Sequence, residues 1–287
     1  MNSKLLVCIL FFFFSLDATC QVSKESMIDK IMESYNHTDQ PGASILVMSD
    51  GKVVFKKGYG ISNIVTKEKI GPQTNFRLAS VTKQFTAMCI LLLEERGMLS
   101  LEDKLSKFFP DFPSYGKGIR IVDLLTHSSG LIDYEDLMPA DQSVQLHDID
   151  CLKLMYTTDS LYFPAGTDYR YSNTGYALLA LIVEEVSKQS FASFLNENIF
   201  IPLKMSSTLA HEEGKSIVQK RAMGHTKLEE SWKMTDQSLT SAVLGDGGIY
   251  SNVEDLSKWI RTLYKRPLIS EAKQIEAFSS KKLKNGK

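Results

Sequence analysis

Five serines in this chain are followed three residues later by a lysine, a spacing that could make the lysine a proton acceptor for a nucleophilic serine. On a helix, residues three apart lie on one face about a turn from each other, so a hydroxyl and an amine can meet. Ser80 and Lys83 differ from the other pairs because they open the longest apolar helical pattern of the chain, which ends at Gly97. The other pairs lie in turns, loops or a polar tail: Ser49/Lys52, Ser114/Lys117, Ser270/Lys273 and Ser279/Lys282.

A second pair of candidate residues, Tyr171 and Asn173, stands directly before another apolar helical pattern at 174–188. A tyrosine on such a loop could carry a proton in a cleft, and an amide two residues later could position a substrate carbonyl. The alternative is that Tyr171 is an ordinary packing residue and Asn173 is the N-cap of the helix. The same Tyr-Ser-Asn tripeptide recurs at 250–252, so the triplet alone does not decide between the two.

Two other segments carry residue types that invite a chemical interpretation. His127 stands beside two serines, but sequence neighbours rarely form a serine–histidine pair, so we interpret it as a structural histidine whose ring ties down a loop. The Gly-Asp-Gly-Gly segment at 245–248 lacks the Lys-Ser/Thr that follows a phosphate loop, and we interpret it as a tight turn or a close backbone approach. The nucleophile-elbow pattern Gly-x-Ser-x-Gly is missing from the sequence, which disfavours an α/β-hydrolase esterase.

Composition and charge argue against several classes of protein. The formal net charge is −1 and no basic stripe is interleaved with aromatic residues, so we expect no nucleic-acid partner. The five histidines have no metal-binding spacing such as His-x-His or His-Glu-x-x-His, and we expect neither a catalytic metal nor a cofactor. The lysine-rich end at 281–287 is interpreted as a solvated basic tail rather than a binding patch.

The N-terminus predicts export. Lys4 precedes an apolar run at 5–16, which is short for a membrane span, and small residues follow it. This pattern is typical of a signal peptide, here 1–20, cleaved before Gln21. We therefore expect a secreted or periplasmic protein with no integral membrane segment after cleavage. A lipid anchor on Cys20 is the less favoured alternative, because its flanking residues fit a lipoprotein site poorly.

The remaining elements must position these candidates within 21–287. We interpret this region as one domain because no linker divides it, although its length also suits two closely packed domains. We expect a helix at 24–35, then a hairpin of 43–48 and 53–58 around the Asp50-Gly51 turn. Cys89 and Cys151, which remain after cleavage, could pair, but Cys89 lies among apolar helix residues and we interpret both as buried thiols. The segment 133–160 is predicted to be a long loop or an inserted helical excursion, and further helices are expected at 80–96, 120–126, 174–188, 191–199 and 253–264.

Four segments resemble motifs of one known family. Each motif is weak alone, but their combination in this chain order is specific. They are Phe-Arg-Leu-Ala-Ser-Val-Thr-Lys at 76–83, Leu-Thr-His-Ser-Ser-Gly-Leu at 125–131, Phe-Pro-Ala-Gly through Tyr-Ser-Asn-Thr-Gly-Tyr at 163–176, and Gly-Gly-Ile-Tyr-Ser-Asn-Val-Glu-Asp-Leu at 247–256. The chain resembles serine hydrolases of the class C β-lactamase-related and penicillin-binding-protein family. That family includes D-alanyl-D-alanine carboxypeptidases, D-aminopeptidases and esterases, and the resemblance covers nearly all of the predicted mature chain.

The resemblance implies an α+β fold of the β-lactamase/transpeptidase type, with an antiparallel sheet flanked by helices and an inserted, mostly helical subdomain. It implies that Ser80 is the nucleophile of an acyl-enzyme, that Lys83 accepts or shuttles its proton, and that Tyr171 is the partner base, while Asn173 orients the substrate amide. Either Lys83 or Tyr171 could be the working base. The implied substrates are small molecules or peptides, namely β-lactams, D-amino-acid peptides or esters, and the resemblance implies no oligomeric state.

One expected motif is missing. Family members carry Lys-Ser/Thr-Gly or His-x-Gly on a strand that supplies the second oxyanion-hole N–H, the first coming from the nucleophile, here Ser80. The segment 225–227 lacks the glycine and a strand context, and 284–286 has the wrong middle residue. We therefore expect a domain that is incomplete at its C-terminus, with its C-terminal strands missing and its N-terminal hairpin left without partner strands. The alternative function is a catalytically impaired module that binds peptidoglycan-like ligands or a partner protein.

Overall fold

The computed structural model describes residues 23–286, and its internal contacts divide the chain into a unit that ends at Ser34 and a unit that begins at Tyr35. In the first unit, helix α1 (Lys24–Ile31) begins where the Ser23 hydroxyl accepts the Ser26 N–H. The predicted helix at 24–35 is therefore shorter, and a 3-10 turn (Glu33–Tyr35) follows it. The predicted signal peptide at 1–20 and its cleavage site lie outside the described residues.

The hairpin was predicted correctly. Strands β1 (Ala43–Ser49) and β2 (Lys52–Tyr59) pair antiparallel around Asp50 and Gly51, whose φ angles are 47° and 72°. Positive φ at both turn residues matches the right-handed twist of the strands, which is why Asp-Gly is favoured there. Among the described residues no third strand joins this pair, as the sequence predicted. Helix α9 (Val253–Lys265) packs against β1, and its Glu254 forms an ion pair of 2.5 Å with Lys56 of β2.

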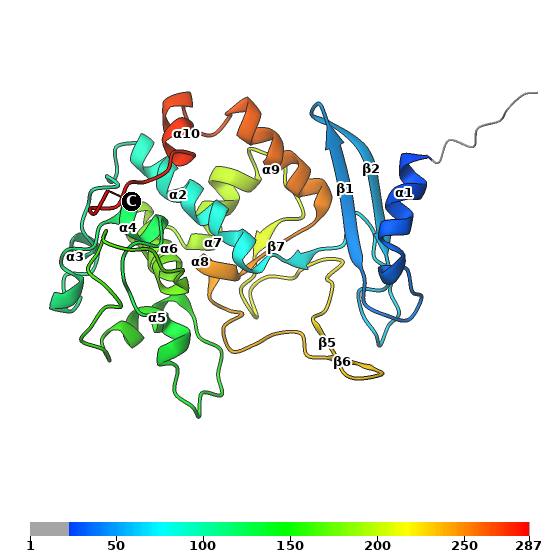
Figure 1. Ribbon diagram of the computed structural model, residues 1–287, viewed down its shortest axis with the longest axis horizontal. Helices are drawn as coiled ribbons and strands as arrows, with labels where there is room; N and C mark the ends of the chain where they lie inside the picture. The colour runs from blue at the N-terminus through cyan, green and yellow to red at the C-terminus, as the bar shows by residue number, and fades with distance from the viewer. Residues whose placement is uncertain (1–22, 287) are drawn as a thin grey trace, which may run out of the picture. The chain divides into compact units, whose positions relative to one another are not determined.

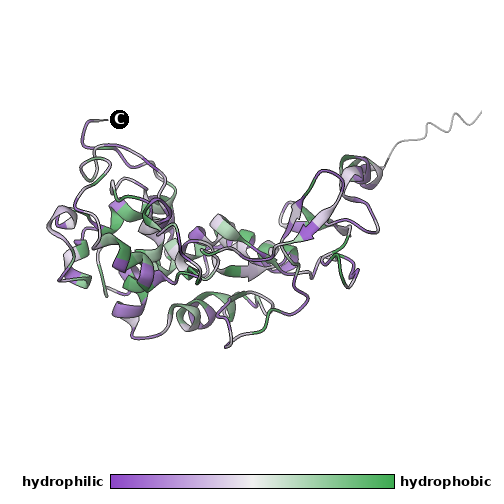
Figure 2. Ribbon diagram, turned by 90° about the horizontal axis from the view of Figure 1, so that it is seen from below, coloured by the Kyte–Doolittle hydropathy of each residue, from purple (hydrophilic) through white to green (hydrophobic). Residues whose placement is uncertain are grey.

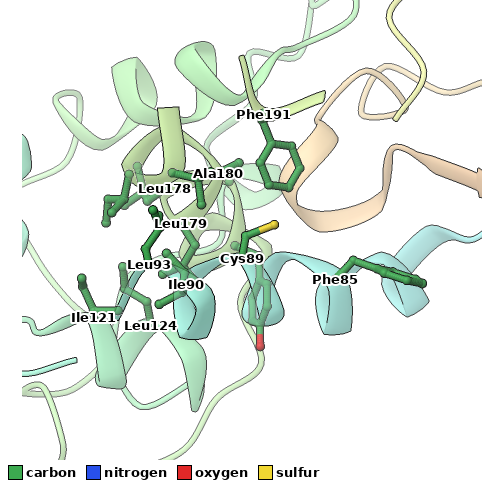
Figure 3. Close-up of a cluster of buried hydrophobic side chains, with 14 of the residues drawn as sticks. Phe85, Cys89, Ile90, Leu93, Ile121, Leu124, Leu178, Leu179, Ala180 and Phe191 are labelled. Atoms are coloured by element: carbon green, nitrogen blue, oxygen red, sulfur yellow. The ribbon is translucent and has the colours of Figure 1, made fainter. Parts of the chain in front are cut away.

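The core of the second unit is built from helices that the apolar periodicity predicted (Figures 1 and 3). Helix α2 (Lys83–Glu95) follows a 3-10 turn (Ala79–Thr82), and helix α6 (Asn173–Ser187) packs across it. Figure 3 shows Cys89 and its neighbours on α2 among side chains from α6, and hydrophobic residues concentrate on the helices of this unit in Figure 2. Cys89 and Cys151 are both buried, unpaired thiols, which confirms their interpretation.

The other helices follow the prediction with shifted ends. The pattern at 191–199 becomes a short α-helix that continues into a π-helical turn (Asn196–Phe200). The segment 133–160 is a helical excursion in part, since it holds a 3-10 helix (Tyr134–Leu137) and an α-helix. The α-helices not yet given are α3 (Leu105–Phe108), α4 (Ile121–Leu125), α5 (Asp148–Met155), α7 (Phe191–Leu195), α8 (Leu244–Gly247) and α10 (Glu271–Ala277), and a further 3-10 helix is Ser114–Gly116.

The remaining strands are short and divide the expected antiparallel sheet into separate pieces. Strand β7 (Ile249–Ser251) pairs with β3 (Phe76–Arg77) on one side and β4 (Leu209–Ala210) on the other. Strands β5 (His225–Lys227) and β6 (Trp232–Met234) form a second hairpin. We expected no strand at 225–227, and this prediction is wrong. Three residues with largely exposed side chains show no apolar alternation, so the pattern cannot be seen in the sequence.

The basic C-terminal segment is solvated only in part: Lys282, Lys284, Asn285 and Gly286 are exposed, whereas Lys281 packs within the second unit, to which the segment belongs. The Lys281 amine contacts the wholly buried carboxylate of Asp123 and donates a hydrogen bond of 3.1 Å to the Ser128 hydroxyl. A buried carboxylate requires charged partners, and Lys281 supplies one in addition to Arg120. Before this segment, α10 lies beside α2 and is joined to it by an ion pair of 2.7 Å between Lys273 and Glu94 (Figure 1). None of the helices within 23–286 has the length and apolar character that crossing a bilayer requires.

Candidate active site

Ser80 lies in the 3-10 turn that leads into α2, and its side chain is exposed. The residue before it, Ala79, has a φ of 46°, a left-handed conformation that a residue with a Cβ rarely adopts. Such strain is found preferentially at functional sites. The Ser80 Oγ lies 2.6 Å from the hydroxyl of Tyr171, 91 residues further along the chain.

Lys83 is almost fully buried one turn further on and makes three hydrogen bonds. Its Nζ donates to the Ser80 Oγ at 3.2 Å, to the Asn173 Oδ1 at 2.8 Å and to the backbone carbonyl of Asp246 at 2.9 Å. An ammonium group has three donors, so this arrangement satisfies the charged form. A neutral amine would keep its two N–H bonds to Asn173 and Asp246 and direct its lone pair at the Ser80 hydroxyl. The two fixed acceptors therefore orient the amine toward Ser80 in either state.

Asn173 is the first residue of α6, and its side chain faces Lys83 rather than capping the helix. The N-cap is Ser172, and the Asn173 backbone N–H donates to the Asp133 carboxylate at 2.7 Å. The Asn173 Nδ2 donates to the Glu135 carboxylate at 3.2 Å. The alternative interpretation of Asn173 as an N-cap is thus wrong, because an aspartate from a distant loop satisfies the first N–H of the helix.

His127 ties down the loop that carries Tyr171, as the sequence predicted. Its Nδ1 accepts the backbone N–H of Ser172 at 3.2 Å, and its ring stacks on the ring of Tyr171 with centroids 4.5 Å apart. Burial, assisted by the nearby charge of Lys83, lowers the pKa of His127 to about 4. The imidazole is therefore neutral near pH 7, with its proton on Nε2 because Nδ1 is an acceptor.

The glycine-rich segment at 245–248 makes the close backbone approach that the sequence predicted. It forms the short helix α8, and a Cβ on Gly245 would lie 2.3 Å from the carbonyl oxygen of Tyr176. The contribution of the Asp246 carbonyl to Lys83 could not be predicted, since any residue type supplies a carbonyl. Behind it, the buried Asp246 carboxyl accepts a hydrogen bond of 2.8 Å from the hydroxyl of Tyr134.

The competing motifs have structural roles elsewhere. Ser270 caps α10 by accepting the N–H of Lys273, although the two share the spacing of Ser80 and Lys83. In the repeated tripeptide at 250–252, Tyr250 is buried in β7 and Asn252 caps α9 with its side chain. Context in three dimensions, rather than the motif itself, distinguishes the residues gathered around Ser80.

The two segments that match part of the missing third motif, 225–227 and 284–286, form hydrogen bonds with other parts of the chain. The His225 ring accepts the backbone N–H of Ile64 at 3.3 Å. The Lys284 amine donates to the carbonyl of Ala165 at 2.6 Å, and the Asn285 side chain donates to the carbonyl of Thr167 at 2.9 Å. Within the described part of the chain, no group of three or more His, Cys, Asp or Glu side chains is arranged to hold a metal ion.

Comparison with known proteins points to one family. The family model described as Beta-lactamase matches residues 25–287. Penicillin-binding protein 4* of Bacillus subtilis (strain 168) is 31% identical over 278 residues, which cover 92% of this chain and 61% of that protein. The chain thus spans only about three fifths of the length of this curated relative.

Solved structures agree in fold. The penicillin binding protein from Bacillus halodurans superposes with a TM-score of 0.73 at 30% identity, covering 86% of this chain and 76% of that one. The octameric penicillin-binding protein homologue from Pyrococcus abyssi gives a TM-score of 0.72 at 28% identity, covering 89% and 59%. The expected β-lactamase/transpeptidase-like α+β fold and the family resemblance are both confirmed.

Proposed function

This chain belongs to the Beta-lactamase family, and on that premise we propose that it is an exported serine hydrolase that cleaves amide or ester bonds through an acyl-enzyme on Ser80. The observation that supports this most is the convergence of three segments on one hydroxyl. The Tyr171 hydroxyl lies 2.6 Å and the Lys83 amine 3.2 Å from the Ser80 Oγ, both within reach for proton transfer.

In the proposed reaction the Ser80 Oγ attacks the substrate carbonyl carbon and its proton passes to the neutral Lys83 amine or to an ionised Tyr171. The tetrahedral intermediate collapses as the bond from carbon to the leaving nitrogen or oxygen breaks, and the leaving group takes that proton. Water then attacks the acyl carbon and gives a proton to the same base. The bond from that carbon to the Ser80 Oγ breaks, the base returns the proton to the Oγ, and the acid is released. Either residue serves this scheme, and Asn173 is proposed to orient the substrate amide.

Several contacts support a preorganised site. The Ser80 backbone N–H stands near the start of α2, where it could donate one oxyanion-hole hydrogen bond. The Lys83 amine is shielded from solvent and held by two acceptors besides Ser80. Rigid placement of reacting groups can supply a large part of a rate enhancement.

The substrate class and the cellular setting are also proposals. We propose a small-molecule or peptide substrate, namely a β-lactam, a D-amino-acid peptide or an ester, and no nucleic-acid partner. Secretion or periplasmic localisation rests on the signal-peptide pattern at 1–20.

Hydrolysis of a chromogenic substrate panel tests this function. Purified protein would be assayed with nitrocefin, a D-amino-acid p-nitroanilide and a p-nitrophenyl ester, alongside Ser80→Ala and the control Ser270→Ala. We expect hydrolysis of at least one substrate, reduced on the order of a thousandfold or more by Ser80→Ala. Ser270 has the same Ser-x-x-Lys spacing as Ser80, and Ser270→Ala should retain activity. Substrate binding without hydrolysis, unaffected by Ser80→Ala, would instead indicate a binding module.

A further inference from the structure

A cavity of about 370 Å³ is lined by residues of α2, α4, α6 and the segment at 276–281, and not by Ser80, Lys83, Tyr171 or Asn173. Most of its wall is apolar. The apolar lining residues include Ala87, Leu91, Leu101, Val122, Leu125 and Tyr176. Small-molecule sites in proteins are typically concave, mostly apolar and about 300–1,000 Å³ in volume. The cavity therefore has the size and character of a site for a small ligand.

The walls of this cavity are tied together by polar contacts. The Glu94 carboxylate on α2 accepts the backbone N–H of Leu101 at 3.0 Å and forms an ion pair of 2.7 Å with Lys273 of α10. On another side, the Tyr176 hydroxyl donates to the carbonyl of Leu125 at 3.0 Å, which joins α6 to α4. An apolar ligand would break none of these contacts, so the cavity is formed in advance of binding.

The polar part of the lining contains an incompletely used donor. The Lys281 amine contacts the wholly buried Asp123 carboxylate and donates to the Ser128 hydroxyl at 3.1 Å. Its third contact, with the Thr126 hydroxyl, is 3.5 Å long, beyond the usual range for an N–H···O hydrogen bond. An ammonium group has three N–H donors, so one of them is only weakly used. Because Lys281 and Thr126 both line the cavity, an oxygen atom of a ligand could accept this N–H.

The charged residues that line the cavity already have partners. Lys281 is paired with Asp123, which is also paired with Arg120 at 3.0 Å, and Glu276 is paired with Lys273 at 2.7 Å. An ionised ligand would have to compete with these pairs for a countercharge. Burial in a mainly apolar space makes an unpaired charge costly. The cavity therefore favours an uncharged ligand.

We propose that this cavity is a binding site for a small uncharged amphiphile, whose apolar body lies against α2 and α4 and whose oxygen accepts the Lys281 N–H. The inference does not depend on the function proposed above. Tyr176 lines the cavity while its ring centre lies 5.6 Å from the Lys83 amine, so the two sites are neighbours. They share no residue among Ser80, Lys83, Tyr171 and Asn173.

Titration with octan-1-ol tests the site, since this alcohol joins an apolar chain to a single hydroxyl. Isothermal titration calorimetry on the purified chain should show one saturable site with a Kd on the order of 0.1–1 mM. Octanoate and octylammonium carry a charged head on a chain of the same length, and each should bind roughly tenfold more weakly. Binding of either ion as tight as that of the alcohol would overturn the assignment to an uncharged ligand.

A matched pair of alanines locates the ligand. Ala87 and Ala192 are both half-buried and packed against the core, but only Ala87 lines the cavity. Ala87→Leu should occupy part of the cavity and weaken octan-1-ol binding roughly tenfold or more, whereas Ala192→Leu should leave it unchanged. Val122→Phe, on α4, fills the same space and serves if Ala87→Leu does not fold.

Ser80→Ala should bind octan-1-ol as tightly as the wild type, because Ser80 lies outside the cavity. Absence of saturable binding in the folded wild-type chain, or unchanged binding in folded Ala87→Leu and Val122→Phe, would overturn this inference. Loss of binding in Ser80→Ala would also overturn it, since the alcohol would then occupy the site of the proposed reaction. Hydrolysis of the substrate panel is measured separately, so failure of the proposed function and failure of this inference can be told apart.

Discussion

At the scale of single residues, the site depends on the three hydrogen bonds that hold the Lys83 amine in place. Its acceptors come from the 3-10 turn before α2, from the first residue of α6 and from α8. Ser80, Lys83, Tyr171 and Asn173 could be proposed from the sequence because their residue types and chain order are distinctive. Asp246 could not be, because it acts through a backbone carbonyl 163 residues away from Lys83, and no side-chain motif marks that contact.

A residue-scale prediction concerns His127. His127→Asn keeps a residue type that tolerates the left-handed φ of 54° but removes the ring that stacks on Tyr171. Because Tyr171 would then be less firmly held, we expect fluorophosphonate inactivation to slow by roughly tenfold to a hundredfold. His211→Asn, at a histidine hydrogen-bonded to Ser216 at 3.0 Å, is the matched control and should react at the wild-type rate. An unchanged rate in folded His127→Asn would remove the positioning role of this ring.

At the scale of elements, long helices with an apolar face were predictable and short elements were not. Periodicity and Gly97 gave α2 its approximate limits, because side-chain burial and a left-handed terminator both leave a pattern in the sequence. Helix α8 and strand β5 are too short to show a period, and tertiary contacts hold them. The packing of Lys281 could not be predicted either, because it depends on a buried aspartate 158 residues away.

An element-scale prediction concerns the fit of α8 against α6. In Gly245→Ala, the new Cβ would lie 2.3 Å from the Tyr176 carbonyl oxygen and 2.7 Å from the Ala180 Cβ, so α8 must shift. We expect the free energy of unfolding to fall by about 1–3 kcal/mol in urea denaturation. Inactivation by the probe should also slow, because Asp246 moves with α8. Gly71→Ala, where a Cβ meets nothing within 4 Å, is the control and should stay within about 0.5 kcal/mol of wild type. Equal stability of the two variants would contradict the close fit.

At the scale of the whole molecule, helices far apart in sequence bring the residues around Ser80 together. The pairing of β3 with β7 joins the segment that leads into Ser80 to the segment that follows α8. The hairpin of β1 and β2 pairs with no further strand among residues 23–286. The family and the α+β fold could be predicted from the order of four motifs. The division of the strands into small sheets could not be, because strand pairing is set by contacts distant in sequence.

The central claim, that Ser80 is the nucleophile, is tested most directly by locating a covalent adduct. Folded protein would be treated with a fluorophosphonate and with a penicillin, and its intact mass and proteolytic peptides would be measured. The account predicts one adduct per chain from at least one reagent, carried on the peptide that contains Ser80 and lost in Ser80→Ala. An adduct on another serine, or an unmodified mass with both reagents in properly folded protein, would contradict it.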